Sequence, residues 1–169
     1  LAASGSIDLI SGESNSDSGT VSIGTGYSSR GVSGDINLGV GVSSGGNGGE
    51  LNISGGGSNA RSGKGGDVTI SAGIGINQES KNGASGGDLV LSGGLAAGKD
   101  VKNTGGDVVL SGGNASNGPG GNIVLESGSS SKGSSGNFEL STSEVEATGV
   151  SGKISLATGT VNSGRSGDV

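Results

Sequence analysis

The sequence predicts an all-β fold, a parallel β-solenoid of about 10–11 coils with about 15 residues per coil. Near copies of one motif, Gly-Asp-Val-Val-Leu-Ser-Gly-Gly at residues 106–113, recur along the whole chain. Within each copy the apolar residues stand two apart, which is typical of a strand with one buried face. Glycine accounts for 42 of 169 residues, whereas ordinary globular domains carry roughly 7%. A mixed-layer globule is therefore not expected.

Each copy of the motif opens with a glycine, at intervals of 14 to 21 residues. The opening residues are Gly5, Gly19, Gly34, Gly49, Gly66, Gly87, Gly106, Gly121, Gly136, Gly152 and Gly167. The apolar pairs are Ile7/Leu9, Val21/Ile23, Ile36/Leu38, Leu51/Ile53, Val68/Ile70, Leu89/Leu91, Val108/Leu110, Ile123/Leu125, Phe138/Leu140 and Ile154/Leu156. Because these pairs keep their register, a disordered Gly/Ser linker is the less favoured alternative.

A unit of this length suits one coil with two short strands and two tight turns. We expect the apolar pair in the first strand and small polar residues in the second, giving a flattened solenoid with two main faces. The expected second strands include 27–30, 58–61, 114–117 and 129–132. The longer intervals need only outward loops, at 73–86 and 94–105. We interpret 1–169 as one solenoid segment, an internal piece of a longer repeat array.

Composition and charge exclude several functions. The formal net charge is −6, which argues against nucleic acid as a partner because phosphate binding needs a basic surface. There is no apolar run long enough for a membrane span. The chain has no His and no Cys, so the usual general base and thiol nucleophile of enzymes are missing, and we expect no catalytic activity.

Two motifs resemble ligand sites, but no cofactor is expected. The Gly-Asp steps at Asp67, Asp88 and Asp107 superficially resemble the nonapeptide calcium β-roll. Their period is about fifteen rather than nine, and one acid per coil supplies too few oxygens, so calcium stays a minor alternative. The stretch 93–100 resembles a phosphate-binding loop, except that Asp100 stands where Ser or Thr would bind magnesium.

Two further sets of residues are candidate sites. Val90, Val109 and Val124 stand between the apolar pairs of successive repeats, so a solenoid would expose them in a line as a lateral contact between rods. Asn52 and Asn114 begin Asn-Ile-Ser and Asn-Ala-Ser, the acceptor pattern for N-glycosylation. Asn114 lies in a turn-like region and is the better candidate.

The repeat Gly-Gly-Asp-Val-x-Leu-Ser-x-Gly resembles the Gly/Ser-rich β-solenoid arrays of large secreted or cell-surface proteins, such as microbial adhesin stalks and algal extracellular fibre proteins. The resemblance implies an extracellular or cell-surface location. It also implies a structural role in a fibre, filament or stalk, with identical rods or further repeats of the same chain as partners. The alternative is an ice-binding or glycan-binding face on the same scaffold.

Overall fold

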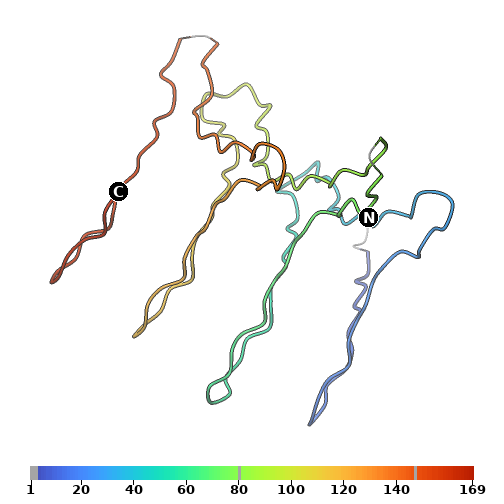
Figure 1. Cartoon of the computed structure of the whole chain (residues 1–169). Coiled ribbons are helices and arrows are strands. Elements are labelled where there is room, and N and C mark those ends of the chain that lie inside the picture. Colours follow the sequence, from blue (N-terminus) through green and yellow to red (C-terminus); the bar gives the residue numbers. More distant parts are fainter. Residues whose placement is uncertain (1–3, 80, 147) are drawn as a thin grey trace. The chain divides into compact units, whose positions relative to one another are not determined.

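The computed structural model describes residues 4–79, 81–146 and 148–169 and contains neither a helix nor a strand within those ranges (Figure 1). The chain divides into two units, Leu1–Asp88 and Leu89–Val169. No helix in the described ranges is long and apolar enough to cross a membrane. The prediction of an all-β parallel solenoid is therefore wrong, and so are its coil count and its two flat faces.

The described residues bury no hydrophobic core. Even the least exposed of the large apolar side chains, Val145, keeps 44% of its surface accessible. The accessible surface is 16,940 Å², against roughly 7,300 Å² for a compact protein of this mass and about 23,000 Å² for its unfolded chain. In surface terms, the isolated chain lies closer to an unfolded polypeptide than to a globule.

The chain bends or turns at intervals near the repeat length. The bends and turns include residues 15–16, 29–31, 44–46, 60–62, 81–82, 99–102, 116–118, 131–133, 148–149 and 162–164. Four of them coincide with the predicted second strands of Ser, Ala, Asn and Gly, so those strands are wrong. The bends thus recur at about the spacing of the repeat, which is here the distance from one bend to the next and not the length of a coil.

Side chains at the start of several turns explain why these segments bend. Short polar side chains accept hydrogen bonds from backbone amides two or three residues later, which favours turns over strands. The bonds are Ser16 N to Ser14 Oγ (3.1 Å), Gly31 N to Ser28 Oγ (3.1 Å), Ala60 N to Ser58 Oγ (3.3 Å), Glu79 N to Asn77 Oδ1 (2.9 Å), Lys102 N to Asp100 Oδ1 (3.0 Å) and Gly133 N to Ser130 Oγ (2.9 Å). The polar half of each repeat is thus a turn.

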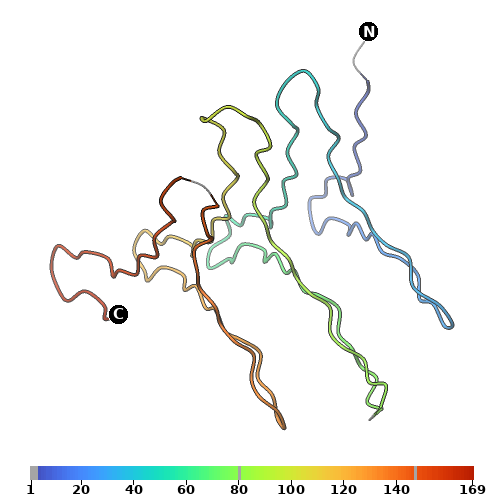
Figure 2. The same cartoon turned by 90° about the horizontal axis from the view of Figure 1, so that it is seen from above.

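Five of these turns are closed at the base by one backbone hydrogen bond between two glycines, which we call the closing bonds. In each, the glycine that opens a repeat donates its amide hydrogen to a glycine of the preceding repeat. The bonds run from Gly66 N to Gly56 O (2.8 Å), Gly87 N to Gly73 O (2.9 Å), Gly106 N to Gly94 O (2.9 Å), Gly121 N to Gly113 O (2.8 Å) and Gly136 N to Gly128 O (2.8 Å). The backbone on the two sides of these turns runs out and back (Figure 2).

Close approach of the two backbones explains the glycine at the donor position Gly106, and also the glycines at 93 and 112, which directly precede two acceptor glycines. A Cβ on Gly106 would lie 2.9 Å from the Gly94 nitrogen, closer than real Cβ atoms approach backbone. A Cβ on Gly93 would overlap the carbonyl oxygen of Gly106, and Gly112 is related to Gly121 in the same way. By contrast, a Cβ on Gly113 would meet nothing within 4 Å.

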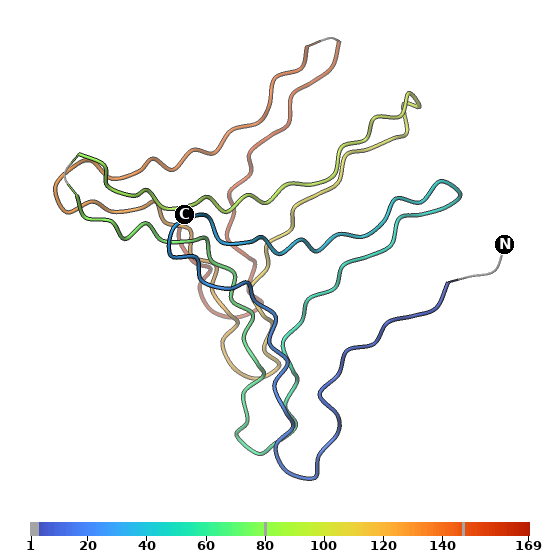
Figure 3. The same cartoon turned by 90° about the vertical axis from the view of Figure 1, so that its right-hand side faces the viewer.

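The closing bonds divide the repetitive middle of the chain into eight-residue segments, which we call the extended segments. These are residues 66–73, 87–94, 106–113 and 121–128. Each begins with a donor glycine, ends with an acceptor glycine and carries one apolar pair. The backbone on the two sides of a turn runs out and back (Figure 3).

The extended segments form no strands because a single bond does not make a ladder. No backbone hydrogen bond joins residues 107–112 to any residue that the structure describes. A β-strand requires repeated pairing with a neighbour, and here pairing stops at the closing glycines. The period of two therefore predicted the extended backbone correctly, but not a partner for it.

Candidate interaction surface

The three valines predicted as a lateral contact lie in the middle of extended segments, all within the unit Leu89–Val169. Val109 is 78% exposed, whereas its neighbours Val108 and Leu110 are 53% and 59% exposed. Val90 and Val124 are likewise more exposed than the apolar residues on either side of them. The alternation expected of extended backbone is present. The valines are not on stacked coils of a β-solenoid, however, because the described residues form no strands.

Each extended segment combines two features of an unpaired strand edge. In 87–94, 106–113 and 121–128 apolar side chains are exposed on both faces, and the backbone amides and carbonyls of residues 107–112 make no hydrogen bond to described backbone. Such an edge is a template for pairing with another chain. Chemically, the extended segments can therefore bind another extended, apolar polypeptide.

The two candidate glycosylation asparagines are both exposed. Asn52 stands between the apolar residues Leu51 and Ile53, whereas Asn114 directly follows the acceptor Gly113 and precedes the bend at 116–118. Both triplets are accessible to a modifying enzyme. The position of Asn114 beside a bend agrees with the turn-like region expected from the sequence.

The acidic residues do not gather into a metal site in the described ranges, where no group of three His, Cys, Asp or Glu is placed to hold an ion. Asp67 instead pairs with Lys64, at 2.8 Å from Nζ to Oδ1, with both side chains exposed. Asp100 uses Oδ1 to accept from the Lys102 amide, and its carbonyl accepts from the Asn103 amide at 3.0 Å. The loop that resembles a phosphate site thus ends in an ordinary turn.

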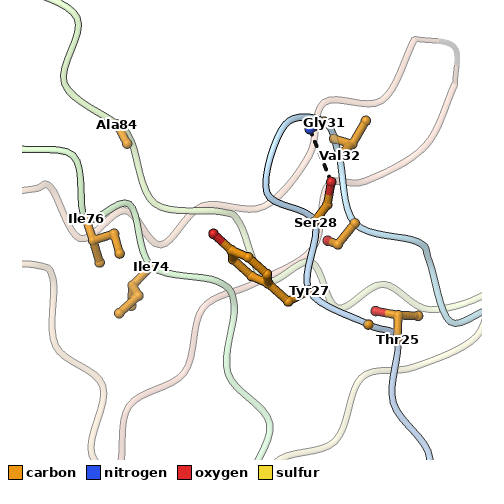
Figure 4. A pocket seen from close by; sticks show the side chains of 10 residues that line it. Thr25, Tyr27, Ser28, Gly31, Val32, Ile74, Ile76 and Ala84 are labelled. Atoms are coloured by element: carbon orange, nitrogen blue, oxygen red, sulfur yellow. Dashed lines mark hydrogen bonds between the residues drawn. The ribbon is translucent and has the colours of Figure 1, made fainter.

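The structure also contains a hollow that the sequence did not predict. It lies within the unit Leu1–Asp88 and is lined by Thr25, Gly26, Tyr27, Ser28, Gly31, Val32, Ser33, Ile74, Ile76 and Ala84 (Figure 4). The Tyr27 hydroxyl is directed toward the backbone that carries Ile76 and Ala84. The large side chains that line the hollow are strongly exposed, so the hollow is open to solvent. The only signal in the sequence is Tyr27 itself, the single tyrosine of the chain.

Comparison with known proteins found no relative. No family model, no curated protein and no solved structure matches this chain. The surface must therefore be interpreted from its own chemistry.

Proposed function

We propose that this chain is a repeat element of an extracellular or cell-surface structural assembly, such as a fibre, filament or stalk. It acts by associating with further copies of itself or with further repeats of the same chain. The observation that supports the proposal is the exposure of the apolar pairs. Aliphatic area left in water costs about 25 cal/mol per Å². A chain whose described residues bury no core therefore gains most by covering this area against another chain.

The equal length of the extended segments supports self-association over an unrelated partner. Residues 66–73, 87–94, 106–113 and 121–128 have the same length and nearly the same order of residue types. Two copies placed side by side can therefore match apolar pair to apolar pair over several repeats. The energy of such an array grows with each matched repeat, as in other repeat proteins.

The distribution of charge also fits association between copies. Acidic residues follow several opening glycines, as at Asp67, Asp88 and Asp107, whereas basic residues occur in turns, as at Arg30 and Lys132. At these residues, opposite charges thus occupy different positions along the repeat. Neighbouring copies in matching register can pair them, with an effect that falls as salt screens the charges.

Sedimentation of the purified chain over a concentration series tests the proposal. The weight-average sedimentation coefficient should rise with concentration. Sodium sulfate should shift this rise to lower concentration, because the salt strengthens apolar burial. Electron microscopy of the concentrated sample should show elongated assemblies.

The alternative functions give different results in the same sample. A glycan-binding or ice-binding surface predicts glycan-array signals or thermal hysteresis from the dilute monomer, and neither requires association. A chain that stays monomeric at every concentration, with sulfate present, would contradict a structural role.

A further inference from the structure

Three asparagines stand directly before a glycine, and all three lie at or beside a bend. They are Asn47, next to the bend at 44–46; Asn82, in the turn at 81–82; and Asn117, in the bend at 116–118. All three are exposed. Other exposed asparagines, such as Asn37 and Asn122, precede a branched apolar residue.

The Asn-Gly sequence has a specific reactivity. The amide nitrogen of the glycine attacks Cγ of the asparagine side chain and loses its proton, and the side-chain nitrogen leaves as ammonia. The product is a five-membered succinimide, and water then opens it at either carbonyl to give aspartate or isoaspartate. Glycine permits the attack because it lacks a Cβ and reaches backbone conformations that other residues avoid.

The surroundings of the three sites differ. A Cβ on Gly48 or Gly118 would meet nothing within 4 Å, and neither amide donates a hydrogen bond to described backbone. A Cβ on Gly83, in contrast, would lie 3.1 Å from the carbonyl oxygen of Glu79. Its turn is also held by a bond from Ala84 N to Asn77 O of 3.2 Å.

We propose that Asn47 and Asn117 are sites of spontaneous deamidation, and that Asn82 reacts more slowly because its turn is held. This modification does not depend on association of the chain. Each conversion removes a neutral amide and adds a carboxylate, so two conversions lower the formal net charge by two from −6. Isoaspartate also adds a methylene group to the main chain at the bend.

Incubation of the full chain in H₂¹⁸O at mildly alkaline pH, followed by peptide mass spectrometry, tests the proposal. Conversion at Asn47 and Asn117 should exceed that at Asn37 and Asn122 by about tenfold or more, with ¹⁸O incorporated into the new carboxylate. Asn82 should fall between the two groups. In denaturant, Asn82 should convert as fast as Asn47.

Two variants provide the matched control. Gly48→Ala and Gly118→Ala place a methyl group in open space, so the bends are kept while the attack is hindered. Each should slow conversion at its own asparagine about tenfold and leave the other unchanged. Equal conversion at all asparagines would overturn the assignment, and an Asn82 that reacts as fast as Asn47 without denaturant would overturn the role of the held turn.

Discussion

Replacing Val109 with Lys is expected to weaken association of the chain about tenfold or more. Val109 is the most exposed of the large apolar residues in its extended segment. Covering a valine side chain contributes about 1.5 kcal/mol, and a lysine ammonium buried in its place would lose its hydration. The shift should be measured as the concentration at which half of the chain sediments as assembly.

Val101→Lys is the matched control for this experiment. Val101 is 99% exposed but lies in the turn at 99–102, outside any extended segment. It carries the same change in size and charge, so it should leave the midpoint within about twofold, as expected of most surface substitutions. If both variants weaken association equally, net charge rather than the extended segment is responsible. If neither does, this segment takes no part in the contact.

Replacing Gly112 with Ala is expected to break the closing bond between Gly121 and Gly113. The new methyl group would overlap the carbonyl oxygen of Gly121, so the two backbones must separate. A backbone hydrogen bond contributes about 1 kcal/mol, so the Gly121 amide should exchange with solvent about fivefold faster. Residue-resolved hydrogen exchange of the dilute chain measures this change.

The neighbouring glycine gives the control. Gly113→Ala adds the same methyl group where nothing lies within 4 Å, so the exchange rate of Gly121 should stay nearly unchanged. The donor Gly106 of the preceding turn should be unaffected in both variants. Equal effects of the two substitutions would mean that backbone entropy, and not the close approach at Gly112, determines the turn.

The local part of the fold could be predicted from the sequence, whereas the tertiary part could not. Opening glycines such as Gly106 and the apolar residues two apart correctly indicated a repeat with extended backbone. The ends of the two long loops, 73–86 and 94–105, also agree with their closing bonds to within one residue. These features depend on conformational preferences of neighbouring residues.

The solenoid prediction failed because a period of two indicates an apolar face but does not say what covers it. Stacking requires contacts between residues far apart in the sequence, and Val109 carries no local signal for such a contact. The second strand failed for another reason. The sequence predicts Ser28, Ser58 and Ser130 as small residues of a strand. Their hydroxyl oxygens instead accept hydrogen bonds from backbone amides two or three residues later, which favours a turn.

The lateral contact at Val90, Val109 and Val124 stays a prediction. Each of the three valines is more exposed than its apolar neighbours. Their alignment on stacked coils required the solenoid, which is wrong. The hollow beside Tyr27 could not have been anticipated, because it joins residues about 50 positions apart without any shared motif.

Residue-resolved amide exchange of the unmodified chain at low concentration tests most directly whether single glycine bonds, and not a hydrogen-bonded core, order this protein. The amides of Gly66, Gly87, Gly106, Gly121 and Gly136 should exchange more slowly than those of the apolar residues between them, such as 108–110. Strong, continuous protection across residues 108–110 and their equivalents in the other repeats would show a ladder of paired strands and would contradict the structure described above.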